Sequence, residues 1–281
     1  MRGRTTLAAA ALALGTVLVA VPARADDVTV KGSDTMVLLG QKWAETYMGR
    51  NPGTKIQVTG GGSGTGIAAL ANGTTDIAES SRPMKPQETE AAESKSGGKV
   101  KSLPVALDAL SIYVAKSNPV EEISVPQLRK IYTGAVGNWK DVGGSDAPIN
   151  LYSRENNSGT YVFFKEHVLS NDDFDPSAQT LPGTAAVVNA VAKDPSGIGY
   201  GGIAYAEGVK RLRVKKDDAS PAVEGTLENA QNGSYGLSRE LFFFYVPGRN
   251  QAADRFADWA VSPEGQKVVK DVGYYPLPAG K

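Results

Sequence analysis

Cysteine is absent from this chain of 281 residues, and histidine occurs once, at position 167. Without cysteine the chain forms no disulfide, uses no thiol nucleophile and offers no thiolate to a metal. A single histidine cannot make a multi-histidine metal site, so we expect His167 to be solvent-facing or structural. The sequence therefore predicts neither a metal nor any other cofactor.

The chain also lacks an excess of positive charge, because its 30 basic residues are matched by 30 acidic residues. Residues 1–25 hold three arginines and no acidic residue, so a chain without them carries a formal charge of −3. A mildly acidic protein is a poor partner for nucleic acid or for anionic lipid. An anionic ligand would have to be bound by local donors, not by a positive field over the whole surface.

The N-terminal segment has the features of a secretory signal. Arg2 and Arg4 precede an apolar run over residues 5–21, and Ala23-Arg24-Ala25 fits the small-residue rule for cleavage. A membrane anchor is the alternative, but this run of 17 residues is short for a spanning helix. No cysteine follows it for lipid attachment. We predict that residues 1–25 are removed and that the protein is periplasmic.

Strand-like and helix-like segments alternate along the rest of the chain, which indicates an α/β fold with largely parallel sheets. Strands are predicted at 28–31, 55–59, 104–107, 110–115, 149–152, 197–203, 211–214 and 241–246. Helices are predicted at 36–48, 66–72, 86–95, 125–131, 160–169, 184–193, 249–261 and 263–270. A G-x-G-x-x-G pattern at 197–202 lies within a predicted strand and not at a strand-to-helix turn, so we assign it no dinucleotide.

The most informative polar segment is the octet 153–160, which reads Ser-Arg-Glu-Asn-Asn-Ser-Gly-Thr. Arg154 is followed by Ser158, Gly159 and Thr160, where a helix is predicted to begin. Hydroxyls and N–H groups at a helix N-terminus suit a tetrahedral oxyanion, and a guanidinium can bond two oxygens at once. The alternative is an ordinary Ser-capped helix beside a surface arginine.

Three further hydroxyl-rich turns point to the same chemistry. They contain Ser33, Asp34 and Thr35; Ser63, Gly64 and Thr65; and Ser81. The first two lie between a predicted strand and a predicted helix, where backbone N–H groups can approach an anion closely. Four such turns in one chain favour an anion site over coincidence.

In this order the segments resemble the periplasmic phosphate-binding proteins of phosphate ABC transporters, above all the shorter branch of that family. The resemblance spans about residues 28 to 275 and rests on segments 30–35, 42–47, 61–66, 80–84 and 153–160. It implies a two-lobed periplasmic-binding-protein fold with hinge strands and a ligand cleft between the lobes. It also implies a monomer that captures inorganic phosphate by closure and delivers it to the permease subunits of an ABC transporter.

The resemblance also assigns roles by position. The family's arginine that makes a double hydrogen bond to phosphate falls on Arg154, and its Ser-Gly-Thr donors fall on Ser158, Gly159 and Thr160. The serine of its Gly-rich turn falls on Ser63. The full predicted ligand-binding set is Ser33, Asp34, Thr35, Ser63, Gly64, Thr65, Ser81, Arg154, Ser158, Gly159 and Thr160.

Two positions depart from the pattern of the longer members of the family. Their first-turn hydroxyl falls on Asp34, and their aspartate that accepts the proton of hydrogen phosphate falls on Ser81. A carboxylate acceptor favours protonated phosphate over sulfate, which carries no proton. We hypothesise that Asp34 takes this role; the alternative is that Asp34 caps the helix that follows it.

Two apolar segments, 109–115 and 241–246, are predicted to cross between the lobes. Lobe 1 then comprises residues 26–110 plus 240–281, and lobe 2 comprises residues 111–239. The alternative is that both segments are buried strands of one sheet, because periodicity does not distinguish the two cases.

The leading functional interpretation is a periplasmic receptor for inorganic phosphate. Another tetrahedral oxyanion (sulfate, arsenate or a small phosphate ester) is the alternative ligand. A phosphoester hydrolase is the alternative class, but no nucleophile–base pair has a recognisable spacing, so we predict no enzyme. A sensor or adhesion role on the same fold stays open, as do the affinity and the anion selectivity.

Overall fold

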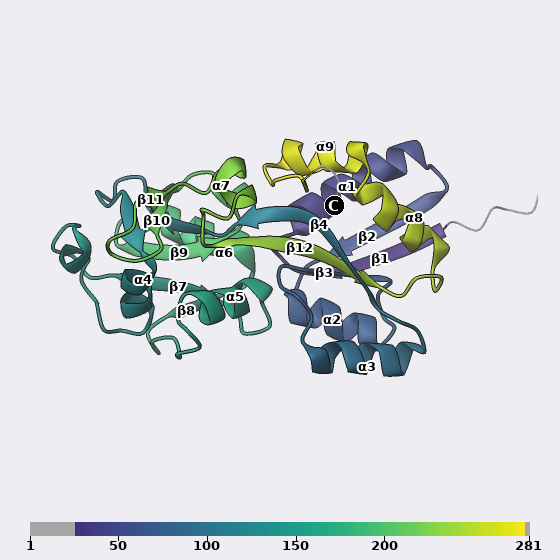
Figure 1. The fold of residues 1–281 in the computed structure, drawn as a ribbon, viewed down its shortest axis with the longest axis horizontal. Helices are drawn as coiled ribbons and strands as arrows, with labels where there is room; N and C mark the ends of the chain where they lie inside the picture. Colours follow the sequence, from purple (N-terminus) through teal and green to yellow (C-terminus); the bar gives the residue numbers. More distant parts are fainter. Residues whose placement is uncertain (1–25, 279–281) are drawn as a thin grey trace, which may run out of the picture.

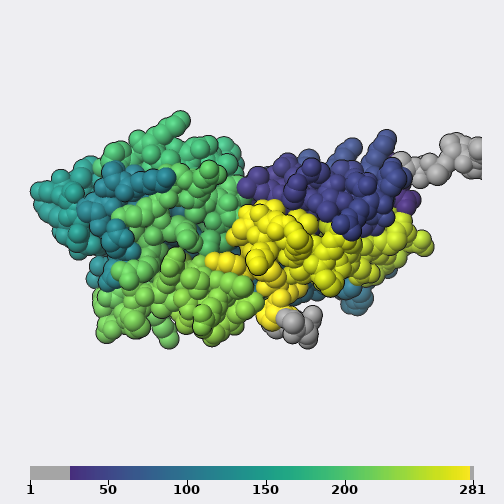
Figure 2. Space-filling model, turned by 90° about the horizontal axis from the view of Figure 1, so that it is seen from above, coloured from purple at the N-terminus to yellow at the C-terminus, as the bar shows by residue number. Residues whose placement is uncertain are grey.

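The computed structural model describes residues 26–278, and the predicted signal segment 1–25 lies outside this range. The chain forms two α/β lobes, each built on its own β-sheet (Figure 1). Both chain ends of the described range lie in the same lobe, where the first helix packs against the last (Figure 2). No helix among residues 26–278 is long and apolar enough to cross a membrane.

Lobe 1 contains a five-stranded sheet in the order β2-β1-β3-β12-β4. Its strands are β1 (Asp26–Gly32), β2 (Thr54–Thr59), β3 (Ile77–Ser80), β4 (Lys101–Ala109) and β12 (Ser238–Tyr245). Helices α1 (Val37–Arg50), α8 (Gln251–Ala260) and α9 (Pro263–Val272) cover one face, and α2 (Ser63–Ala71) and α3 (Pro86–Ser96) lie on the other (Figure 1). The main core lies under the first group of helices, where Trp43 and Phe256 both pack near Phe243.

Lobe 2 contains a seven-stranded sheet in the order β11-β10-β5-β9-β7-β8, with β6 paired to β10. Its strands are β5 (Ser111–Val114), β6 (Glu122–Ser124), β7 (Asn150–Arg154), β8 (Gln179–Leu181), β9 (Gly197–Gly201), β10 (Lys210–Lys215) and β11 (Ala222–Val223). Its helices are α4 (Val125–Tyr132), α5 (Gly159–His167), α6 (Gly183–Lys193) and α7 (Leu227–Gln231), with short 3₁₀ turns at Trp139–Val142 and Ile203–Tyr205. Stacked rings of Phe164 and Tyr200, 4.0 Å apart, lie in its core.

All sixteen predicted strands and helices overlap an observed element, but the predicted largely parallel sheets are wrong. Strand β12 runs antiparallel to both β3 and β4, and β5 runs antiparallel to both β9 and β10. The cause is the connection between the lobes. Strands β5 and β12 are the ones by which the chain enters one lobe from the other, so each runs away from the other lobe while its neighbours in the sheet run toward it. The elements missed by the prediction, among them β3, β6, β8, β11 and α7, have five residues or fewer, too few to show a period.

The two passages between the sheets lie side by side. The chain leaves lobe 1 between Ala109 and Ser111 and re-enters it at Ser238. The backbone N–H of Leu110 donates to the carbonyl of Leu237 at 2.9 Å, which joins the passages. The predicted crossing 109–115 is thus split at Leu110, and the segment 241–246 lies almost wholly within β12, just after the return passage.

One buried acid lies between the sheet of lobe 1 and helix α1. Glu79 on β3 is fully buried, and neither of its carboxyl oxygens has a hydrogen-bond partner among the described residues. Gly40 leaves the space for it, because a Cβ there would lie 2.3 Å from Oε1 of Glu79. Burial raises the pKa of Glu79 well above its usual value, because it disfavours the ionised form in the folded protein.

This carboxyl predicts a stability that falls as pH rises. Above the ordinary glutamate pKa the unfolded chain ionises Glu79 while the folded chain does not, so each pH unit favours unfolding by about 1.4 kcal/mol until the folded pKa is reached. Glu79→Gln should remove this dependence and stabilise the protein at neutral pH. Urea unfolding at acidic and neutral pH measures it, with exposed Glu90→Gln as the control. An unchanged pH dependence in Glu79→Gln would contradict the assignment.

Candidate functional site

The polar turns singled out in the sequence meet between the two lobes. From lobe 1, residues 33–35 join β1 to α1, Ser63 begins α2, and Ser81 follows β3. From lobe 2, Arg154 ends β7 and residues 158–160 begin α5. These positions are the carboxyl ends of strands and the N-termini of helices, where α/β folds bind ligands. The serine and threonine side chains among them are nearly all buried, with Thr160, Ser63 and Ser81 at 0% exposure.

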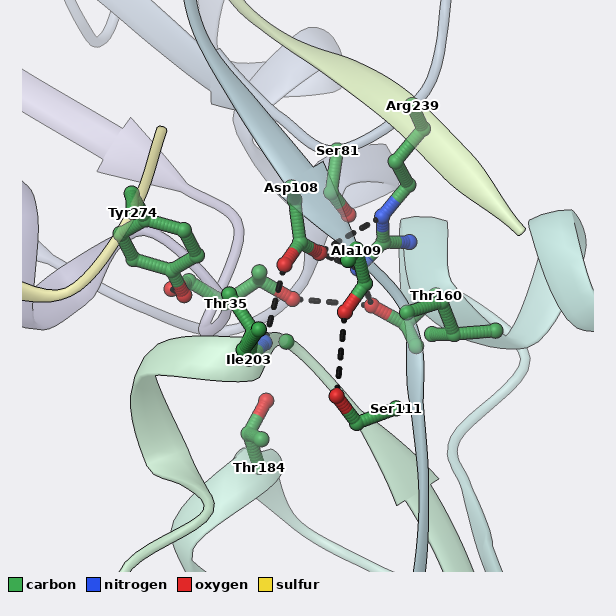
Figure 3. A network of polar contacts seen from close by, with 12 residues as sticks. Thr35, Ser81, Asp108, Ala109, Ser111, Thr160, Thr184, Ile203, Arg239 and Tyr274 are labelled. Carbon is green, nitrogen blue, oxygen red and sulfur yellow. Dashed lines mark hydrogen bonds and ion pairs between the residues drawn. The ribbon is translucent and has the colours of Figure 1, made fainter. Parts of the chain in front are cut away.

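Hydroxyl groups from opposite lobes are in direct contact. Thr35 Oγ1 and Thr160 Oγ1 lie 2.8 Å apart (Figure 3). The backbone of Gly159 lies against two lobe 1 serines, because a Cβ there would lie 2.4 Å from Ser63 Oγ and 2.6 Å from Ser81 Oγ. The structure therefore shows the lobes closed upon each other at this surface, and a side chain at position 159 would force Ser63 and Ser81 to shift.

Two helix N-termini face this surface, those of α2 at Ser63 and of α5 at Gly159. The first N–H groups of a helix have no partner inside the helix, and the helix dipole makes that end positive. Ser158 caps α5 by accepting hydrogen bonds from the N–H groups of Thr160 and Tyr161. The cap fixes the first turn of α5 at the surface between the lobes.

Arg154 is buried, with 1% of its side chain exposed. Its Nη2 donates to Oδ2 of Asp34 at 2.7 Å across the lobes, and its Nη1 donates to the hydroxyl of Thr184 at 3.0 Å. Its Nε has no partner among the described residues. Because the ion pair with Asp34 cancels the arginine's charge, this part of the site offers hydrogen bonds without net charge.

Asp34 does not cap helix α1, so that alternative is wrong. The N-cap residue is Met36, which makes no side-chain capping bond. The carboxylate of Asp34 instead accepts from Arg154 with Oδ2 and from the N–H of Gly61 with Oδ1, at 2.8 Å. Tyr205 from lobe 2 donates its hydroxyl to the carbonyl of Asp34 at 2.7 Å, and burial raises the pKa of Tyr205, so it stays a donor.

Gly64 and Thr65 take part in a contact between the lobes. The N–H of Gly64 donates to the carbonyl of Asn157 at 2.9 Å, and Nδ2 of Asn157 donates to Oγ1 of Thr65 at 3.0 Å. Nδ2 of Asn157 also donates to the carbonyl of Gly61. Asn157 was not among the predicted residues, although its place inside the octet 153–160 was the available signal.

Other functional candidates had no signal in the sequence. Thr184, Tyr205, Asp108 and Arg239 lie in segments without a motif, and the fold alone brings them to the site. Figure 3 shows Asp108 and Arg239 beside Thr35 and Thr160. Among the residues that the structure describes, no cluster of histidine and acidic side chains could hold a metal ion. His167 is exposed at the end of α5 and stacks on the ring of Phe163, 4.0 Å away, in agreement with the predicted solvent-facing position.

Comparison with known proteins identifies relatives along nearly the whole chain. Residues 19–264 match the model of the PBP superfamily domain. The phosphate-binding protein PstS of Pseudomonas aeruginosa is 38% identical over 88% of this chain and 82% of its own length. The phosphate-binding protein PstS of Staphylococcus epidermidis is 34% identical over 88% of this chain and 78% of its own length.

Solved structures give the same result. A putative phosphate ABC transporter substrate-binding protein from Clostridium perfringens, with bound phosphate, superposes with a TM-score of 0.82 at 29% identity. It covers 90% of this chain and 100% of its own. An ABC-type phosphate transport receptor from Vibrio cholerae superposes with a TM-score of 0.71 at 27% identity, over 89% of this chain and 100% of its own. These proteins confirm the two-lobed α/β fold.

The contact at Gly159 predicts that a single methyl group opposes closure. Gly159→Ala places a Cβ against the hydroxyls of Ser63 and Ser81, so we expect the lobes to stay further apart. Small-angle X-ray scattering with excess phosphate or sulfate, added as probe anions, should give a larger radius of gyration than for the unmodified protein. Gly137→Ala is the matched control, because nothing lies within 4 Å of a Cβ at that position. Identical scattering from both variants in the anion that closes the unmodified protein would contradict the prediction.

Proposed function

This chain belongs to the PBP superfamily and, within it, to the phosphate-binding proteins of phosphate ABC transporters, and we propose that it captures inorganic phosphate between its two lobes. The observation that carries the proposal is that the Ser158–Thr160 turn of lobe 2 meets buried hydroxyls of lobe 1, while Arg154 beside it bonds to Asp34 of lobe 1. Phosphate is a tetrahedral oxyanion, and its oxygens need many donors when they leave water.

The arrangement supports capture by closure. Ser33, Thr35, Ser63 and Ser81 belong to lobe 1, so an open form would present them to an entering anion. Rotation about the adjacent passages at Leu110 and Leu237 would then bring Arg154 and the α5 N-terminus onto the anion. We place the hinge at these passages, which lie within three residues of the predicted boundaries between lobe 1 (26–110 plus 240–281) and lobe 2 (111–239). Closure would replace water by fixed donors around the phosphate.

Several further properties follow from this proposal. The protein would work in the periplasm, after removal of residues 1–25, as a monomer that delivers phosphate to permease subunits. It would catalyse no reaction, because no histidine or cysteine lies beside the anion-binding hydroxyls to act as a base or a nucleophile. Asp34 would serve twice, by holding Arg154 and by accepting the phosphate proton, since each carboxylate oxygen keeps a second lone pair.

Calorimetry tests the ligand directly. We expect protein refolded free of bound anion to bind phosphate tightly and to give no heat with sulfate. A phosphatase assay on a small phosphate ester should give no turnover. Binding of sulfate instead of phosphate would transfer the assignment to another oxyanion, and hydrolysis would overturn the binding role.

Arg154→Lys measures the contribution of the guanidinium. A lysine keeps the charge but loses the planar pair of donors, so phosphate affinity should fall about 10- to 100-fold. The control is Arg129→Lys, whose arginine forms an exposed ion pair with Asp172 on the surface of lobe 2. Equal losses in both variants would contradict a direct role for Arg154.

Asp34→Asn separates the two roles of the carboxylate. If Asp34 accepts a hydrogen bond from the proton of phosphate, the variant should bind phosphate about tenfold more weakly and should begin to bind sulfate. The exposed Asp141→Asn is the control. If phosphate affinity falls while sulfate stays excluded, Asp34 only holds Arg154, and the acceptor role is wrong.

A further inference from the structure

A second buried arginine lies beside the anion-binding hydroxyls, on the strands that connect the lobes. Arg239 on β12 is the cross-strand neighbour of Asp108 on β4. Its Nε and Nη2 donate to Oδ2 of Asp108 at 3.0 and 2.8 Å. The side chains are 3% and 0% exposed. Burying an ion pair costs desolvation energy, so the Arg239–Asp108 pair is weak evidence of a stabilising role. Its place beside the hydroxyls between the lobes points instead to a role in the site.

The pair reaches into lobe 2 at two points. The other oxygen of Asp108, Oδ1, accepts from the N–H of Ile203 at 2.9 Å. The Nη2 of Arg239 also donates to Oγ1 of Thr160 at 2.9 Å (Figure 3). The guanidinium carbon lies 5.3 Å from the ring centre of Phe163, on the same helix as Thr160. Arg239 therefore holds the N-terminus of α5 from the side of the hinge.

The contact with Arg239 restricts what the threonine hydroxyls can do. Thr160 Oγ1 accepts a hydrogen from Arg239 and shares a second bond with Thr35 Oγ1, 2.8 Å away. An arginine cannot accept a hydrogen bond, so this direction is fixed. The two hydroxyls carry two hydrogens, and one of these lies between them. Whichever way that shared bond points, one O–H is left over, and Arg239 occupies a lone pair of Thr160 Oγ1 that could otherwise accept a hydrogen bond from the anion.

We propose that Arg239 is a positioning residue that favours donation from the Thr35–Thr160 pair to the anion, because it occupies a lone pair of Thr160 and polarises the O–H that is left over. The inference rests on the proposed function and deepens it, because it names a residue that helps to determine which protonation state of phosphate the protein binds. A donor at this position binds an anion oxygen without a hydrogen more strongly than a protonated oxygen, which is the weaker acceptor. Hydrogen bonds in a chain also strengthen one another, so the guanidinium makes the final O–H a better donor.

The experiment replaces the pair together, because removal of Arg239 alone would leave a buried carboxylate without a partner. The variant R239Q/D108N keeps two polar side chains and no charge. We expect its phosphate affinity to fall about tenfold at a pH where phosphate is mostly a dianion, and to fall less where the monoanion dominates. The matched control R129Q/D172N removes an exposed ion pair from lobe 2 and should leave the affinity and its pH profile unchanged.

A second variant tests whether Arg239 acts through Thr160. In the background Thr160→Val, the substitutions R239Q/D108N should weaken phosphate binding no further, because the hydroxyl they orient is gone. An additive loss, or a loss of affinity with the same pH profile as the unmodified protein, would overturn the inference and leave Arg239 a structural residue.

The same variants separate this inference from the proposed function. If the unmodified protein binds no phosphate, the proposed function fails and urea unfolding then decides the inference. Non-additive changes in unfolding free energy between R239Q/D108N and Thr160→Val would show that the guanidinium and the hydroxyl are coupled. Additive changes would overturn the coupling without any use of a ligand.

Discussion

The ion pair between Arg154 and Asp34 spans the two lobes, and the site is arranged around it. A guanidinium that is 1% exposed needs a partner, and its partner comes from the opposite lobe, 120 residues away in the chain. When the lobes separate, this pair must break and both groups must return to water. An anion that bonds to the same guanidinium while the lobes close can shift that balance, which couples binding to closure.

The rest of the site follows from the neutrality of this pair. Because Asp34 cancels its charge, Arg154 contributes the geometry of its hydrogen bonds more than an electrostatic attraction for the anion. That attraction must come from the hydroxyls and the helix N-termini. Arg239 and Asp108 form a second buried pair on the connecting strands, in which the aspartate again cancels the charge of the arginine. Burial likewise favours the uncharged form of Glu79 by raising its pKa. A mildly acidic protein can therefore bind an anion, because its hydrogen-bond donors are held in fixed positions and are shielded from water.

The sequence predicted most of the regular structure and most of the residues that meet at the site. Long segments with a clear period, such as those that form α1 and α8, were located within two residues at each end. The direction of the strands was not predictable, because it depends on which lobe the chain has just left. Gly64 and Thr65 were predicted as ligand-binding residues, and their polar groups contact Asn157 in the structure; their role toward the anion stays a prediction.

Local chemistry is what the sequence by itself determined: hydroxyl-rich turns, glycines that permit close approach, and an arginine just before a helix start. These features act within a few residues, so they can be read along the chain. The tertiary structure alone decided which of these groups meet. Arg239 and Thr160 are 79 residues apart, and Arg239 and Asp108 are 131 apart. No local pattern joins such residues, because the first contact exists only when the two lobes meet, and the second only when β4 and β12 have paired in one sheet.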